Sequence, residues 1–222
     1  MTQSLRVPLT GGRTASTPLA TRALLAGGAV AGPLFLGVGL IEGLTRDGFD
    51  FTRNALSQLS LGSMGWIQVV NFLVTGALLL AGAVGLRRTL GPTAGGTWAP
   101  RLLGVFGASF LLAGVFTADP GAGFPAGTPV GPATLSGHGT VHMLSGMVGY
   151  LALCAAFFVL ARRFAAQGQR GRALAYRLLP LGIMAGFAGS AATVMAFTAA
   201  AALGLLALTA ALAPLAGPTG QQ

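Results

Sequence analysis

The residues of this chain best suited to chemistry are its only two histidines and one nearby aspartate, in the stretch FTADPGAGFPAGTPVGPATLSGHGTVH at residues 116–142. His138 and His142 have H-x-x-x-H spacing, which on a helix places both imidazoles on one face, where they could bind one metal ion. Asp119 directly precedes Pro120, at the end of an apolar run, and could supply an oxygen ligand. Two histidines, a carboxylate and a water match the ligand set of a catalytic zinc site.

The same three residues permit other interpretations. The histidines could hydrogen-bond Asp119 or the main chain and fix the loop, or they could bind protons and sense pH. The pattern lacks the adjacent glutamate of the metalloprotease helix, so it has no built-in general base. The sequence contains no Walker loop, no G-x-S-x-G elbow and no C-x-x-C motif, so metal site, pH sensor and structural loop are the alternatives.

A second polar segment, TRDGFDFTRNALSQLSLGSMG at residues 45–65, carries two candidate catalytic residues, Asp50 and Ser57. Beside a zinc ion they would serve a hydrolase in which a metal-bound water attacks a lipid headgroup. The structural interpretation instead pairs Asp50 with neighbouring arginines and lets Asn54 or Ser57 cap a short helix. Glu42, just before this segment, is costly to bury in a membrane unless Arg46, one helical turn later, neutralises it.

The composition shows which elements must position these residues. Of 222 residues, 53% are hydrophobic and only 8% are charged, whereas soluble domains carry about 25% charged residues. Several apolar runs approach the roughly 20 residues that a helix needs to cross a bilayer. The sequence therefore predicts an all-α, polytopic transmembrane helical bundle in contact with the lipid bilayer. A β-barrel would show short alternating segments instead.

We expect six spans, with five as the alternative. The apolar run from residue 178 to 216 would be about 58 Å long as one helix, nearly twice the hydrocarbon thickness. It is therefore divided by a turn near residues 197–201, and a basic loop at 161–177 precedes it. The four earlier spans are placed at residues 23–44, 66–86, 102–118 and 139–160.

The chain organisation follows from these spans. Residues 1–22 are expected to be a disordered cytoplasmic tail, residues 23–216 the bundle, and residues 217–222 a disordered C-terminal tail. Glycines four residues apart, such as Gly28 and Gly32, predict close helix packing.

Charge gives the orientation. The net charge of +9 comes from arginine alone, and all arginines except Arg46 and Arg53 fall on one side of the predicted spans. By the positive-inside rule that side is cytoplasmic, so the N-terminus is expected inside the cell. All four acids and both histidines then lie at the outer face. The arginines form short clusters rather than a broad basic face, so nucleic acid is not expected as a partner.

The chain resembles a family of bacterial integral-membrane proteins known as domain of unknown function 998. The matching pieces are RDGFD, NALSQLSLG, GWIQVVNF, FTADPGAGFP and HGTVHMLSG, within residues 23–197. The resemblance implies a six-helix bundle, and it places Asp50, Ser57, Asp119, His138 and His142 on motif positions. A looser similarity connects these Ser, Asp and His residues with membrane hydrolases of the alkaline-ceramidase and progestin/adiponectin-receptor type, which hold zinc with three histidines.

Two functions follow. In the first, this is a multi-pass protein of the bacterial inner membrane whose polar residues lock its outer loops, acting as a scaffold or in small-molecule permeation. In the second, it is a zinc-dependent hydrolase of lipid headgroups, with Asp119, His138 and His142 as ligands and Ser57 and Asp50 beside them. Substrate and protein partners stay open, and a homo-oligomer is compatible with the sequence.

Overall fold

The computed structural model describes residues 17–131 and 133–217, and in these ranges the chain is all-α, as predicted. The helices are α1 (Leu19–Thr45), α2 (Gly65–Leu90), α3 (Ala94–Val115), α4 (Gly137–Ala166), α5 (Arg170–Gly189) and α6 (Val194–Ala216). A short 3₁₀ helix, η1 (Leu56–Ser60), lies between α1 and α2. Most of the predicted N-terminal tail and nearly all of the predicted C-terminal tail lie outside the described residues.

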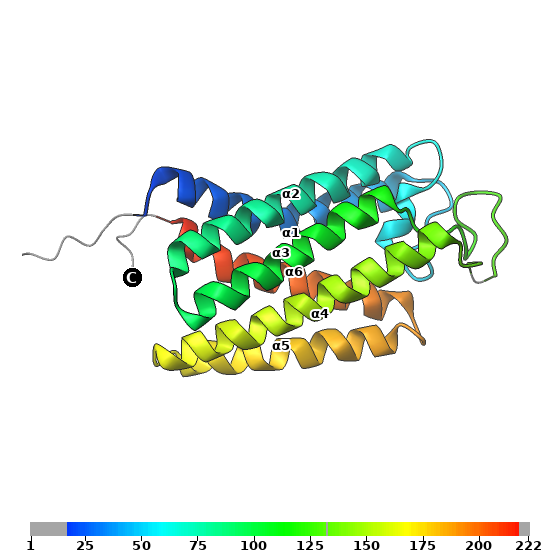
Figure 1. The fold of residues 1–222 in the computed structure, drawn as a ribbon. Coiled ribbons are helices and arrows are strands. Elements are labelled where there is room, and N and C mark those ends of the chain that lie inside the picture. The colour runs from blue at the N-terminus through cyan, green and yellow to red at the C-terminus, as the bar shows by residue number, and fades with distance from the viewer. Residues whose placement is uncertain (1–16, 132, 218–222) are drawn as a thin grey trace, which may run out of the picture.

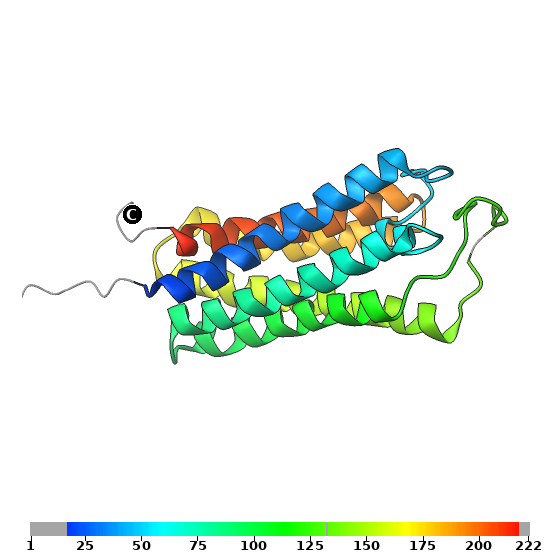
Figure 2. The same cartoon turned by 90° about the horizontal axis from the view of Figure 1, so that it is seen from above.

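The long helices run lengthwise beside one another (Figures 1 and 2). Each helix packs against the next in sequence, and α6 returns to pack against α1, so the bundle is a closed ring. The start of α1 and the end of α6 therefore meet at one end of the bundle. There the Nε atom of Arg22 donates a hydrogen bond of 3.0 Å to the carbonyl oxygen of Ala216.

Five of the helices, α1, α2, α3, α4 and α6, are long and apolar enough to cross a membrane. The exception is α5, which begins at Arg170 and carries two further arginines, Arg172 and Arg177, in its first half. The sequence interpretation assigned these arginines to a loop and started the next span after them. Helix α5 instead continues through them, because long arginine side chains can reach the aqueous interface from within a helix.

The expected turn at residues 197–201 is wrong, because these residues lie inside α6. The chain turns at residues 190–193. Thr193 is the N-cap residue of α6, and its hydroxyl accepts a hydrogen bond of 3.3 Å from the N–H of Met195. A single capping hydroxyl gives no signal in hydropathy, and Gly189 and Ser190 beside the turn do not stand out in a run that holds several other glycines.

Two of the prolines inside the helices free carbonyl oxygens that neighbouring helices bind. Pro33 has no N–H to offer the carbonyl of Ala29, and the hydroxyl of Thr209 on α6 donates to that oxygen at 2.8 Å. In α3, the carbonyl four residues before Pro100 instead accepts from Nη1 of Arg87 on α2, at 2.7 Å. These bonds tie α1 to α6 and α2 to α3.

Glycines allow α1 to approach its two neighbours closely. A Cβ atom on Gly28 would lie 2.7 Å from the Cα of Gly82 on α2, and one on Gly32 would lie 2.9 Å from the carbonyl oxygen of Leu205 on α6. The predicted close packing at these two positions is confirmed. Because main-chain atoms form these contacts, they leave no space for a side chain.

Candidate functional site

The two ends of the bundle differ in charge. We call the end where α1 finishes and α4 begins the acidic end, and the opposite end the basic end. Among the described residues, every arginine except Arg46 and Arg53 lies within about two turns of the basic end. All acidic side chains of the protein lie at the acidic end: Glu42, Asp47, Asp50 and Asp119.

Two loops interlock at the acidic end, and we call residues 46–64 and 116–131 together the cap (Figure 1). Gln58 of the first loop donates to the main-chain carbonyl of Gly121 in the second, at 3.2 Å. Asn54, which is buried, donates to the next carbonyl at 3.4 Å. Gln58 and Asn54 thus connect the two loops, and neither is among the residues that the sequence interpretation expected to lock them.

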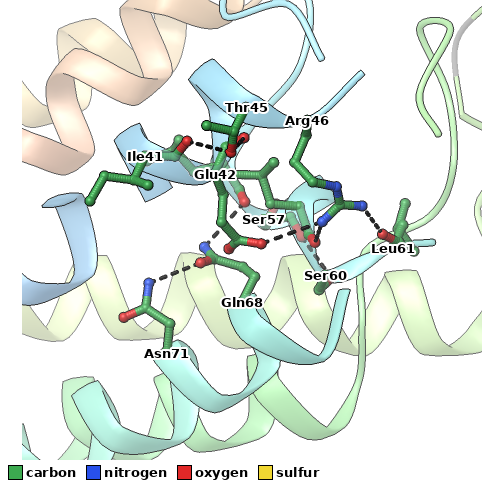
Figure 3. Close-up of polar contacts among 11 residues, drawn as sticks. Ile41, Glu42, Thr45, Arg46, Ser57, Ser60, Leu61, Gln68 and Asn71 are labelled. Carbon is green, nitrogen blue, oxygen red and sulfur yellow. Dashed lines mark hydrogen bonds and ion pairs between the residues drawn. The ribbon is translucent and has the colours of Figure 1, made fainter. Parts of the chain in front are cut away.

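Arg46 joins the parts of the cap (Figure 3). Its Nη1 atom lies 3.3 Å from Oε1 of Glu42 and donates to the carbonyl of Leu59 at 3.1 Å, while Nη2 donates to the carbonyl of Leu61 at 2.6 Å. Its guanidinium also lies 5.4 Å from the ring centroid of Phe124, a buried residue of the second loop. The expected pairing of Glu42 with Arg46 is confirmed, and the arginine in addition connects three segments of chain.

A line of buried polar side chains on α2 continues below the cap. Gln68, Asn71 and Thr75 follow one helix face, and the amide nitrogen of Asn71 donates to Oε1 of Gln68 at 2.9 Å (Figure 3). Within the described residues, Oε2 of Glu42, Oδ1 of Asn71 and Oγ1 of Thr75 are buried without a protein partner. The sequence interpretation missed these residues, although three polar residues at i, i+3 and i+7 in an apolar run were a usable signal.

A cavity of about 80 Å³ lies beneath the cap, between α1, η1, α2, α3, α4 and α6. Phe35, Phe72 and Phe110 form one aromatic wall, with the centroid of the Phe35 ring 4.9 Å from that of Phe72 and 5.1 Å from that of Phe110. Neither an arginine nor an acid is among the described residues that line it. The polar lining residues are Ser57, Ser109, His142, Tyr150 and Thr198.

The end of α3 fixes the orientation and tautomer of His142. Its Nδ1 atom lies 2.9 Å from the carbonyl oxygen of Phe116 and 3.2 Å from that of Ala113. Carbonyl oxygens only accept hydrogen bonds, so Nδ1 carries a proton, and in a neutral imidazole with this tautomer Nε2 is an acceptor. The buried ring packs edge-on against Phe72 in the cavity wall. In the part of the chain that the structure describes, Nε2 has no hydrogen-bond partner.

Asp119 binds the first residues of α4. Its Oδ1 accepts from the hydroxyl of Ser136 at 2.6 Å and its Oδ2 from the N–H of the same residue at 2.8 Å. These bonds, the hydroxyl's first, lower the pKa of Asp119 below its ordinary value. Ser136 in turn caps α4 by accepting from the N–H of Gly139. His138 is exposed, with its ring edge-on to Phe116 at 5.3 Å between centroids.

The three predicted zinc ligands thus lie at one corner of the bundle with different partners. Asp119 is engaged by Ser136, and Nδ1 of His142 is engaged by the end of α3. Over residues 17–131 and 133–217, no three His, Cys, Asp or Glu side chains are grouped so that they could hold a metal ion. As placed, Asp119, His138 and His142 do not form the ligand set of a zinc site.

The two predicted catalytic residues have separate surroundings. Asp50 accepts from the hydroxyl of Thr52 at 2.6 Å and from Nε of Arg53 at 2.9 Å, and these bonds, the hydroxyl's first, lower its pKa. Its expected pairing with a neighbouring arginine is therefore present. Ser57 lies on η1 and lines the cavity, and its carbonyl accepts from the hydroxyl of Ser60 at 2.7 Å. Among the described residues, no hydrogen bond connects Asp50 to Ser57.

The chain matches the family described as protein of unknown function DUF998 over residues 29–219. It belongs to this family. The matched range contains the cap, the Glu42–Arg46 pair and the cavity, and it extends beyond the motif pieces that first indicated the resemblance. No curated protein and no solved structure gives a significant match. Any function must therefore be argued from the site itself.

Proposed function

We propose that this DUF998 protein binds a small, neutral, largely apolar molecule that carries a hydroxyl group, in the cavity beneath the cap. The Nε2 atom of His142 carries the proposal, because His142 lines the cavity and a ligand hydroxyl could donate a hydrogen bond to this nitrogen, which has no partner among the described residues. The aromatic wall suits an apolar body. The lack of arginine and acid among the described lining residues favours a neutral ligand.

The arrangement of the cap supports binding rather than catalysis. Asn54 and Gln58 of the first loop donate to carbonyl oxygens of the second loop, and Arg46 donates to the carbonyl of Leu59 within the first. These bonds hold the acidic end closed. A rigid closure above an apolar cavity keeps water away from a ligand. This closure fits a scaffold or a role in small-molecule permeation better than it fits a hydrolase, whose reaction needs water.

Gly146 offers a direct test of the cavity. It lines the cavity, and a Cβ atom there would meet no heavy atom within 4 Å. Gly146→Leu should therefore occupy ligand space without displacing its neighbours. In nanodiscs, a short alkanol carrying a diazirine should photolabel the lining residues of the wild type. The variant should label about tenfold less, since the loss of about two methylene contacts, at about 0.8 kcal/mol each, changes binding by about that factor. Mass spectrometry of the labelled peptides gives the measurement.

Gly37→Leu on α1 is the matched control, because its Cβ is equally unobstructed and Gly37 does not line the cavity. Its labelling should equal that of the wild type. The methyl ether of the probe lacks the donor and should label more weakly than the alcohol. Equal labelling in both glycine variants would contradict the cavity, and equal labelling by alcohol and ether would contradict the role of His142.

We further propose that all six long helices cross a bacterial cell membrane, with the basic end in the cytoplasm. Helix α4 finishes at the basic end and α6 begins at the acidic end, so α5 must connect the two (Figure 1). Its 20 residues give a length of about 30 Å, close to the hydrocarbon thickness. The excess of arginine at the basic end supports the orientation.

Cysteine labelling tests this topology. With the buried Cys154 replaced by alanine, Thr128→Cys in the cap should react with a membrane-impermeant maleimide on intact cells. Gln167→Cys, at the turn between α4 and α5, should react only after permeabilisation. The reverse pattern would invert the orientation. Reaction of both positions on intact cells would show that α4 does not separate two compartments.

A further inference from the structure

The basic end of the bundle has positive charge that no acidic side chain balances. In the described residues there are two ion pairs, Glu42 with Arg46 and Asp50 with Arg53, and both lie at the acidic end. Every acidic side chain of the protein is at that end too. The counter-charge for the arginines of the basic end must therefore come from the surroundings of the protein.

A second cavity, of about 170 Å³, lies at the basic end between α2, α4, α5 and α6. Arg163 of α4 and Arg172 of α5 line it, together with Gln167 and Gln169 of the turn that connects these helices. Its remaining wall is apolar. The leucines that form most of this wall are Leu86, Leu90, Leu160, Leu212 and Leu215.

The two arginines are available for an anion. Arg172 is held in place, because its Nη1 donates to Oε1 of Gln169 at 3.1 Å and its guanidinium lies 5.1 Å from the ring centroid of Phe164. The half-buried side chain of Arg163 has no hydrogen-bond partner in the part of the chain that the structure describes. A guanidinium has five N–H donors in a planar arrangement that matches phosphate oxygens.

We propose that this cavity binds the phosphate group of an anionic phospholipid. The two guanidinium groups would hold the phosphate oxygens, and the leucine wall would contact the first part of the acyl chains. A free phosphate ion shares the same chemistry at the arginines, but it would leave the apolar wall in contact with water. The proposal is independent of the ligand in the cavity beneath the cap.

Native mass spectrometry of the full-length protein in detergent tests the site, with phosphatidylglycerol as probe and zwitterionic phosphatidylcholine for comparison. Arg163→Gln and Arg172→Gln should each weaken phosphatidylglycerol binding about tenfold, the effect of losing one charge-assisted hydrogen bond. Arg162→Gln and Arg170→Gln are matched controls. They remove the same charge next to the site, from residues that do not line the cavity, and should leave binding within about twofold of the wild type.

If all four variants weaken phosphatidylglycerol binding equally, the binding depends only on the general charge of the basic end, and the proposed site is wrong. Arg163→Lys keeps the charge and should retain part of the binding, which separates loss of charge from misfolding. Melting temperatures without added lipid should be similar for all variants. If inorganic phosphate displaces phosphatidylglycerol at equal concentration, the site belongs to free phosphate and the lipid assignment is wrong.

Discussion

Arg46→Met should destabilise the folded protein by about 3–5 kcal/mol, the cost of leaving one member of a buried ion pair without its partner. The side chain of Arg46 is 14% exposed and that of Glu42 only 6%, so water cannot replace the lost guanidinium. The carbonyls of Leu59 and Leu61 lose their donor at the same time. Thermal or denaturant unfolding of the purified protein in detergent measures the effect.

Arg53→Met is the matched control for this prediction. Arg53 pairs with Asp50 in the same cap, but their side chains are 46% and 38% exposed. Loss of such an exposed pair should cost less than about 1 kcal/mol. The double variant Glu42→Gln/Arg46→Met removes the unpaired charge and should regain part of the stability. Equal losses in Arg46→Met and Arg53→Met would show that Arg46 does not hold the cap together.

The Glu42–Arg46 pair could be predicted from the sequence because its two members are one helical turn apart. Asp50 and Arg53 could be predicted as a pair because they are only three positions apart in the loop that follows α1. The cap as a whole could not be predicted, since Gln58 and Gly121 are 63 positions apart and no local pattern encodes their contact. Spacing in the sequence predicts ion pairs between residues that are close along the chain. The closure at the acidic end depends instead on how the two loops of the cap contact each other.

The histidines show a second limit of sequence reasoning. Their i, i+4 spacing correctly places them on one helix, but His138 is exposed and His142 is buried. Helix α3 ends at Val115, so the first turn of α4 extends past its neighbour, and only the second turn meets the free carbonyls of α3. Which histidine finds hydrogen-bond partners depends on where the neighbouring helix α3 ends. The spacing of the two histidines carries no information about that position.

The polar line on α2 was missed for a related reason. Asn71 and Thr75 lie within a run whose hydropathy is that of a membrane span, and an average over the run hides them. Their burial indicates that they face the interior rather than lipid. The sequence therefore predicted the first four long helices, while the turn before α6 and the interior faces of the helices required the structure.

Gly28→Val should cost about 3 kcal/mol or more, because its side chain would meet main-chain atoms that cannot rotate away. A Cβ atom there would lie 2.7 Å from the Cα of Gly82 and 3.0 Å from Cδ1 of Leu212. Helix α1 would have to move away from both α2 and α6. The bond from Thr209 to the carbonyl that Pro33 frees should then lengthen as well.

Gly37→Val on the same helix meets no atom within 4 Å of its Cβ, so it should change stability by less than about 0.5 kcal/mol. Gly28→Ala should fall between the two valine variants, because it adds the clashing Cβ alone. Melting temperature and the yield of monodisperse protein provide the readouts. If both valine variants unfold alike, the contact of α1 with α2 is looser than its geometry implies. If the order holds, tight packing at Gly28 and Gly32 positions α1 so that Phe35, one turn further along, forms the wall of the cavity beneath the cap.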